Sequence, residues 1–215
     1  CSPGPLRSSS GLSVIPDCVA GPAADMSIDT LLVAGCPRVT DLSLETVTLD
    51  WLRQASKESR RFGSICSGAF ALAAAGLLDG ARVTTHWAVA AALARAFPKV
   101  VVEEDAIHIR DGKVRTAAGV TAGIDGALTV AAMLRGVETA QSIQLYMQYA
   151  PQPPFDSGAP ETAPKAVLEE ARRKLEAITK QREETARLVA TRLNLSQHML
   201  SYYKLCSMSD LYDLK

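Results

Sequence analysis

Cys66 is the residue whose sequence surroundings point most directly to chemistry. It stands between an apolar run at residues 62–65 and an alanine-rich segment at residues 68–78, where we expect a strand to give way to a helix. The start of a helix carries partial positive charge and unpaired N–H groups, which favour the nucleophilic thiolate of a cysteine. The small neighbours Ser67 and Gly68 permit the sharp turn of a nucleophile elbow. A buried cysteine that only packs as a small apolar residue fits the same local pattern.

Gly35 and Cys36 follow a second apolar run, residues 29–34, which is expected to be a neighbouring parallel strand. Their backbone N–H groups, together with that of Ser67, could surround negative charge that develops on a substrate bound to Cys66. The alternative is an ordinary glycine turn in which Cys36 has no role.

His86, in the sequence TTHW, ends a third predicted strand. A histidine near a thiol can exchange protons near neutral pH, so His86 could serve as an acid, a base or an orienting donor. The alternative is a ring whose hydrogen bonds are satisfied by the backbone at the edge of the strand.

A glycine-rich segment, residues 119–126, opens a later predicted helix. Its spacing is neither that of the dinucleotide fingerprint nor that of a P-loop, which argues against phosphate binding. A loop that lines a small-molecule pocket fits better, and we expect three residues to do so: Gly119, Val120 and Thr121.

The elements that must position these residues alternate regularly along the chain. Stacked strand–helix units predict an α/β fold with a mostly parallel sheet sandwiched by helices. Reactive groups in such sheets gather beyond the carboxyl ends of the strands, and all the candidates lie at predicted strand ends. We expect strands at 29–35, 62–66, 81–87 and within 100–119, and helices at 44–61, 68–78, 89–97 and 122–134.

The C-terminal part of the chain does not continue this alternation of strands and helices. Four prolines between Pro151 and Pro160 predict an ordered surface loop over residues 142–164. A long charged helix follows, and Arg182 interrupts its apolar stripe, which favours a docking or dimer-contact helix over a coiled coil. We therefore expect an α/β domain over 1–164, a charged helical extension over 165–193 and an unassigned tail over 194–215.

Composition narrows the classes of partner. The 23 basic and 23 acidic residues among 215 cancel, which argues against nucleic acid or an anionic membrane as the partner. No apolar run approaches the roughly 20 residues of a membrane span, and no signal segment opens the chain, so a cytoplasmic protein is expected. The five cysteines are scattered without C-x-x-C spacing, so neither a disulfide framework nor a metal site is indicated.

Four segments of the chain belong together: RSSSGLSVIPD, DTLLVAGCP, SICSGAFALAAAGLLDGARVTTHW and GVTAGIDGAL. They resemble the ThiJ/PfpI superfamily over roughly residues 4–160. Within it they resemble the branch that contains isonitrile hydratases and the sensing domains of GlxA-type, AraC-family transcription regulators. The resemblance implies a flavodoxin-like, class I glutamine-amidotransferase-like fold, Cys66 at the nucleophile position and a homodimer. It also implies an N-terminally incomplete domain, without the first strand and helix that supply an acidic residue.

The function implied is that of an isonitrile-hydratase-like enzyme, in which the thiolate of Cys66 adds to an isocyanide and water releases an N-substituted formamide. Ser67, where these enzymes carry threonine, would position water or donate a hydrogen bond, and no metal or organic cofactor is expected. Cys36 replaces a glycine of the family's double-glycine turn, which costs about 1 kcal/mol if that position needs a positive φ. The alternative is a non-catalytic, small-molecule-sensing domain related to the AraC-family regulators.

Overall fold

The main sheet is built of four strands that meet the candidate site at one end. They are β3 (Thr30–Val33), β4 (Arg61–Ile65), β7 (His108–Asp111) and β8 (Val114–Ala117). The computed structural model describes residues 4–8, 11–17, 27–37 and 39–192, and the order of these strands is β3-β4-β8-β7. β3, β4 and β8 are parallel, and β7 is antiparallel to β8. The predicted α/β class with a mainly parallel sheet is confirmed.

The register of the parallel strands brings their carboxyl ends together. Val33 pairs with Ser64, and Ile65 pairs with Ala117, so β3, β4 and β8 end at nearly the same level. β4 lies between the other two and is buried except at Ile65, its last residue. The segment that follows β4 therefore emerges between the ends of two neighbouring strands.

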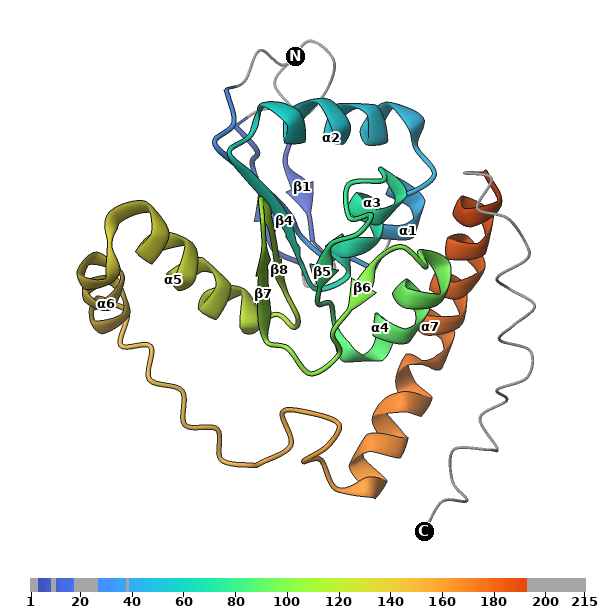
Figure 1. The fold of residues 1–215 in the computed structure, drawn as a ribbon. Helices are drawn as coiled ribbons and strands as arrows, with labels where there is room; N and C mark the ends of the chain where they lie inside the picture. The colour runs from blue at the N-terminus through green and yellow to red at the C-terminus, as the bar shows by residue number, and fades with distance from the viewer. Residues whose placement is uncertain (1–3, 9–10, 18–26, 38, 193–215) are drawn as a thin grey trace.

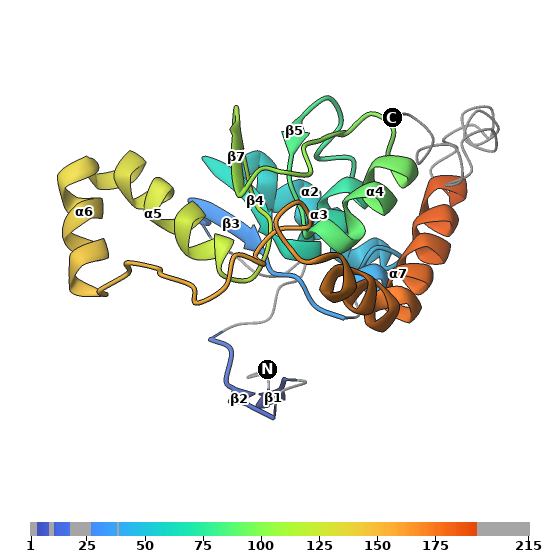
Figure 2. The same cartoon turned by 90° about the horizontal axis from the view of Figure 1, so that it is seen from below.

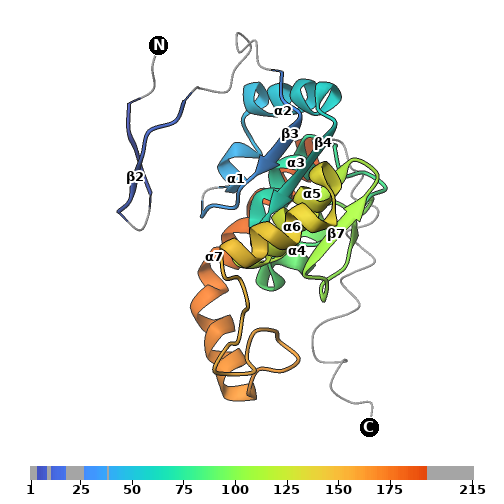
Figure 3. The same ribbon diagram turned by 90° about the vertical axis from the view of Figure 1, so that its left-hand side faces the viewer.

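Helices cover both faces of this sheet (Figures 1 and 3). On one face lie α5 (Ala122–Arg135) and α6 (Val137–Tyr146). On the other face lie α1 (Val39–Leu42), α2 (Thr46–Glu58), α3 (Ala69–Ala74) and α4 (Trp87–Ala96). All six residues of α3 are buried because all are apolar, and Phe70 packs edge-to-face on Phe97 with ring centroids 6.5 Å apart.

Two short strand pairs complete the described β structure. β5 (Arg82–Val83) and β6 (Val101–Val102) pair in parallel beside the helical layer. β1 (Leu6–Arg7) and β2 (Ser13–Val14) form an antiparallel hairpin that stands apart from the body of the molecule (Figures 2 and 3). The segment that follows β5 carries Thr84, Thr85 and His86 to the start of α4.

Two predicted elements are shorter in the structure than in the sequence interpretation. β5 covers only two residues of the strand predicted at 81–87, because Thr84 and Thr85 direct their hydrogen bonds to other segments. The helix predicted at 68–78 is regular only over α3, because Gly76 adopts a φ of 74° and ends it.

The loop predicted at 142–164 is wrong at its beginning. Residues 142–146 belong to α6, which follows the turn at Gly136, where φ is 89°. The breakers begin only at Pro151, so nothing in residues 137–146 opposes a helix. From α6 the chain crosses the molecule without helix or strand as far as Pro164 (Figure 1).

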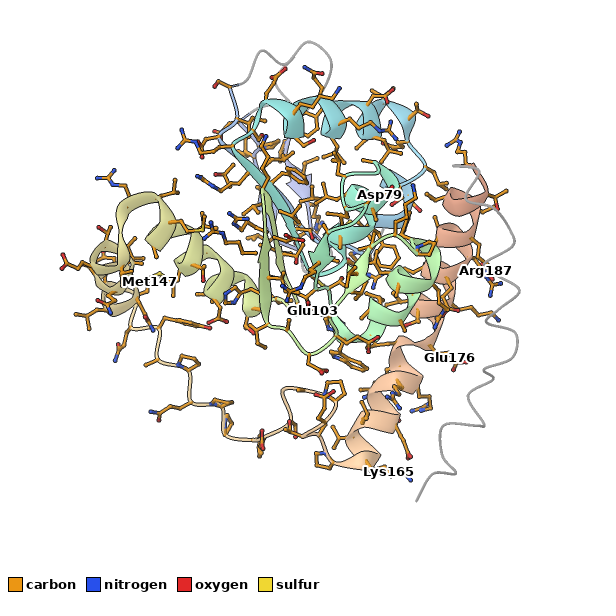
Figure 4. All side chains as sticks on the ribbon, viewed as in Figure 1. Asp79, Glu103, Met147, Lys165, Glu176 and Arg187 are labelled. Atoms are coloured by element: carbon orange, nitrogen blue, oxygen red, sulfur yellow. The ribbon has the colours of Figure 1, made fainter. Side chains whose placement is uncertain are left out.

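The last described helix, α7 (Lys165–Arg192), packs along α4. Its inner side buries Ala186 and Val189 in the hydrophobic core, and Arg95 of α4 forms an ion pair with Glu183. Its outer side carries exposed charges, among them Arg187 (Figure 4). The helix therefore docks on its own chain, whereas the tail predicted at 194–215 lies outside the described residues.

In the described part of the chain, no helix combines the length and hydrophobicity needed to cross a bilayer.

Candidate functional site

Cys66 forms a strained elbow at the end of β4. It begins a 3₁₀ turn, Cys66–Gly68, that leads directly into α3, and its φ is 57°. A non-glycine residue in this left-handed conformation costs about 1 kcal/mol or more, so the surrounding structure must impose it. The thiol is partly exposed. A half-buried cysteine on a strained strand-to-helix turn has the geometry of a nucleophile elbow.

Two glycines let the elbow lie directly against the end of β3. A Cβ on Gly68 would be 2.1 Å from the carbonyl oxygen of Val33, and a Cβ on Gly35 would be 2.9 Å from the Cβ of Cys66. Neither position has room for a side chain. The loop after β3 and the elbow after β4 are therefore in direct backbone contact.

A threonine holds the strained peptide. The Oγ1 of Thr85 donates a 2.8 Å hydrogen bond to the carbonyl oxygen of Cys66, and the side chain of Thr85 is buried. The preceding residue, Thr84, donates from its backbone to Oγ1 of Thr116 in β8 at 2.9 Å, which anchors this loop to the sheet. Sequence reasoning treated both threonines only as strand residues.

Ser67 and Cys36 are joined through a hydrogen bond. The Oγ of Ser67 donates to the carbonyl oxygen of Cys36 at 3.4 Å, and the side chain of Ser67 is buried. Among the described non-glycine residues, only Cys66 and Gln148 have a positive φ. Cys36 therefore avoids the backbone cost considered for a replaced glycine.

His86 lies at the N-terminus of α4, where its Nδ1 accepts a 3.3 Å hydrogen bond from the backbone of Ala88. Burial lowers the pKa of His86, and the nearby charge of Arg182 lowers it further. The ring is therefore neutral near pH 7 and carries its proton on Nε2, because Nδ1 accepts. The alternative of a histidine satisfied by the backbone therefore holds for Nδ1 only. Nε2 carries the proton and can act as a donor.

Arg182 of α7 is a further residue whose place beside the elbow the sequence did not predict. Its Nη2 donates to the carbonyl oxygen of Cys36 at 3.4 Å, and its buried Nε has no acceptor among the described residues. Burial lowers the pKa of Arg182, whereas negative charge on Cys66 and Cys36 opposes that effect. A signal existed in the sequence: an arginine that interrupts a packed apolar stripe needs a partner in the protein.

The segment Gly119, Val120 and Thr121 lies at the same edge of the sheet as Cys66, because β8 pairs with β4 up to Ala117. Val120 is 83% exposed. At Gly123, an added Cβ would lie 3.2 Å from the side chain of Ile65, so the start of α5 sits closely against the end of β4. Their part in a binding pocket stays a prediction.

An open groove of about 730 Å³ runs between α4 and α7 beside His86. α4 contributes Trp87 and three alanines to its walls, and α7 contributes charged side chains that include Arg172 and Glu176. The rings of His86 and Trp87 have centroids 5.5 Å apart. Within the described ranges, no three His, Cys, Asp or Glu side chains are grouped to hold a metal ion.

Comparisons with known proteins point to one family. A model described as the DJ-1/PfpI family matches residues 2–133. An isonitrile hydratase of Pseudomonas putida is 42% identical over 89% of this chain and 82% of its own length. The transcriptional regulator GlxA of Rhizobium meliloti is 35% identical over 68% of this chain, but only 44% of the regulator is covered. The crystal structure of a ThiJ/PfpI family protein from Pseudomonas syringae superposes with a TM-score of 0.75 at 31% identity, over 85% of this chain and 74% of that one.

Proposed function

The chain belongs to the DJ-1/PfpI family, and on that premise we propose that it hydrates isonitriles with Cys66 as the nucleophile. One observation carries the proposal: a half-buried cysteine is held at φ 57° on the turn between β4 and α3. The 42% identity to an isonitrile hydratase over 82% of that enzyme supports the choice of reaction. Strain at a cysteine in such a turn is typical of a functional site.

The proposed reaction has two steps. The thiolate of Cys66 attacks the terminal carbon of the isocyanide, and that carbon takes up a proton to give an enzyme-bound thioimidate. Water then adds to the same carbon, the nitrogen is protonated, and the C–S bond breaks to release the N-substituted formamide and the thiolate. One water is consumed: its oxygen ends on carbon, one of its hydrogens ends on nitrogen, and the other leaves as a proton that balances the one carbon took up in the first step.

The residues around Cys66 have proposed roles that follow from their contacts. The hydroxyl of Ser67 is engaged with Cys36, so we assign it to holding the two loops together. The backbone N–H groups of Gly35, Cys36 and Ser67 are proposed to surround the developing charge. His86 is proposed to donate from Nε2, because its other nitrogen accepts from the backbone.

The remaining parts of the site would bind the rest of the substrate. We propose that Gly119, Val120 and Thr121 form one wall, since they follow the end of β8, the strand next to β4. The groove between α4 and α7 offers room for the nitrogen substituent, with Trp87 and alanines as apolar contacts. We therefore propose as the substrate class a small isocyanide whose substituent packs on the apolar α4 wall of this groove.

The test is turnover of an alkyl isocyanide by the purified 215-residue chain, with formamide measured by proton NMR. Cys66→Ala should reduce the rate to that of the buffer, whereas Cys36→Ala should keep most of the wild-type activity. Both variants should unfold at the wild-type temperature, because each removes a single sulfur. Equal turnover by wild type and Cys66→Ala would rule out this mechanism.

A second candidate is a non-catalytic domain that senses a small molecule. Its support is the 35% identity to GlxA over 68% of this chain, although the chain spans less than half of that regulator. A sensing domain would bind isocyanides or related molecules, seen as a rise in unfolding temperature, without forming product. The turnover assay therefore separates the two candidates.

We also infer that the chain assembles as a homodimer. The support is the apolar exposed surface of α6, on which Val137 is 63%, Leu145 82% and Tyr146 93% exposed. Such a group of large apolar side chains is typical of an interaction surface. Light scattering during size-exclusion chromatography should give twice the chain mass of 22.9 kDa, and a single-chain mass would exclude the dimer.

A further inference from the structure

α7 is fixed to the body of the molecule by residues that directly follow Arg182. Four residues later Ala186 is buried in the core, and the next residue, Glu183, pairs with Arg95 of α4. Residues four apart lie on the same face of a helix, so Arg182 is on the docked face of α7. A long flexible cation is thereby given a defined place beside the elbow.

The contacts of Arg182 converge on the elbow. Its Nη2 and the Oγ of Ser67 both donate to the carbonyl oxygen of Cys36, each at 3.4 Å. Ser67 is the residue after Cys66, and its N–H lies 2.9 Å from where a Cβ of Gly35 would be. One carbonyl thus links α7, the loop after β3 and the elbow.

Among the residues that the structure describes, the guanidinium has no carboxylate partner of the kind that a buried arginine ordinarily has. Nε is buried and has no acceptor in the described part of the chain, and the neighbouring acid, Glu183, is engaged with Arg95. Burying a cation costs several kcal/mol unless a negative group compensates it. Among the described residues, the titratable groups that interact electrostatically with Arg182 are the thiols of Cys66 and Cys36 and the ring of His86.

We propose that Arg182 is a positioning residue that stabilises the thiolate of Cys66, so that the C-terminal helix completes the site. The inference rests on the proposed function only in taking Cys66 as the nucleophile. A cation beside a thiol favours loss of the proton, and the hydrogen bond to Cys36 keeps that cation in place. After C–S bond cleavage, the same cation stabilises the thiolate of Cys66 as the leaving group.

The test measures alkylation of Cys66 by iodoacetamide, read by mass spectrometry of its peptide, and expressed as the rate at pH 7 relative to the rate at pH 10. Arg182→Met should lower this ratio about tenfold, because a neighbouring opposite charge shifts an ionisation by that order. Arg182→Lys keeps a positive charge and should restore most of the ratio. Arg187→Met, on the exposed side of α7, makes the same change of charge and should leave the ratio unchanged.

If Arg182 only held the fold together, Arg182→Met would lower the unfolding temperature and leave the alkylation ratio unchanged. The proposal predicts the opposite on both measurements. Because Arg182→Met removes a buried charge that has no carboxylate partner in residues 39–192, it should unfold at or above the wild-type temperature. A wild-type alkylation ratio in Arg182→Met, or the same loss in Arg187→Met, would overturn the proposal. The assay contains no isocyanide, so a chain that hydrates no isocyanide but loses thiolate in Arg182→Met would disprove the proposed function and leave this inference standing.

Discussion

Gly35 and Cys66 lie closer together than two residues with side chains can. A Cβ built on Gly35 would be 2.9 Å from the Cβ of Cys66, and equally close to the backbone nitrogen and Oγ of Ser67. The loop after β3 is consequently one wall of the elbow. Any group added there must displace backbone as well as side-chain atoms.

Gly35→Ala should therefore disable the site. The added methyl group meets the backbone nitrogen of Ser67 and must displace the elbow, at a cost of about 1–3 kcal/mol in the free energy of unfolding. Urea unfolding measures that loss, and alkylation of Cys66 at pH 7 should slow at least tenfold. Gly126→Ala is the control, because its Cβ would be 3.5 Å from the nearest atom, an ordinary contact inside α5.

Gly126→Ala should keep the wild-type alkylation rate and gain up to about 1 kcal/mol of stability, as alanine replaces glycine in a helix. If Gly35→Ala instead behaved like Gly126→Ala, the close approach of the two loops would not be needed for reactivity.

Thr85→Val tests what holds the strained peptide of Cys66. The substitution keeps the shape but removes the 2.8 Å hydrogen bond to the carbonyl oxygen of Cys66. An unpaired buried carbonyl costs about 1–3 kcal/mol, and the elbow should relax from its φ of 57°. Thermal unfolding and alkylation of Cys66 should both report the change.

The matched control for the lost hydroxyl is Thr139→Val, whose exposed Oγ1 donates only to the carbonyl of Arg135 within the helical region. Its effect on stability should stay within about 0.5 kcal/mol. A Thr85→Val variant with unchanged stability and alkylation would show that Thr85 does not support the elbow.

The strand ends were predictable because each buried strand is a short apolar run that stops at small residues. This pattern locates Gly35 and Cys66 from the sequence, and parallel pairing then brings them to one edge. Arg182 could not be located in this way, because its contact with Cys36 joins residues 146 positions apart and depends on how α7 docks. The early end of β5 was likewise hidden, since the hydroxyls of Thr84 and Thr85 replace sheet hydrogen bonds.

Asp29→Asn should weaken the pairing of β3 with β4. Asp29 accepts hydrogen bonds from Thr30 and from the buried Arg61, and it pairs with Arg60 at 3.2 Å. The hydrogen bond from Thr30 and the charges of both arginines lower the pKa of Asp29 below its ordinary 3.8. Its contribution to stability is therefore complete above pH 3.8 and is lost as the pH falls through the folded pKa.

Urea midpoints at pH 7 should be lower for Asp29→Asn than for wild type, and the difference should shrink between pH 4 and pH 2. Asp50→Asn is the control, because Asp50 pairs with Arg53 on an exposed helix surface, where such pairs contribute little. A constant difference between Asp29→Asn and wild type down to pH 2 would contradict the assigned protonation.

His86→Asn should make the protein less sensitive to mild acid. Burial and the charge of Arg182 hold the pKa of His86 below its ordinary 6.5, so the unfolded chain takes up a proton at a higher pH than the folded protein. Stability contributed by the neutral ring is complete above pH 6.5 and is lost as the pH falls through the folded pKa. Asparagine does not titrate in this range and is a good N-cap for α4.

The measurement is the urea midpoint of both proteins at pH 7.5, 6.5 and 5.5. The wild type should lose more stability across this range than His86→Asn. Arg182→Met, which lacks the repelling charge, should lose less stability than the wild type across the same range. The triple comparison separates the two causes, because burial of the ring persists when Arg182 is replaced whereas the repulsion does not. Equal acid sensitivity of wild type and His86→Asn would mean that His86 binds its proton equally in the folded and unfolded states, and the neutral Nε2 donor assigned to the site would be lost with it.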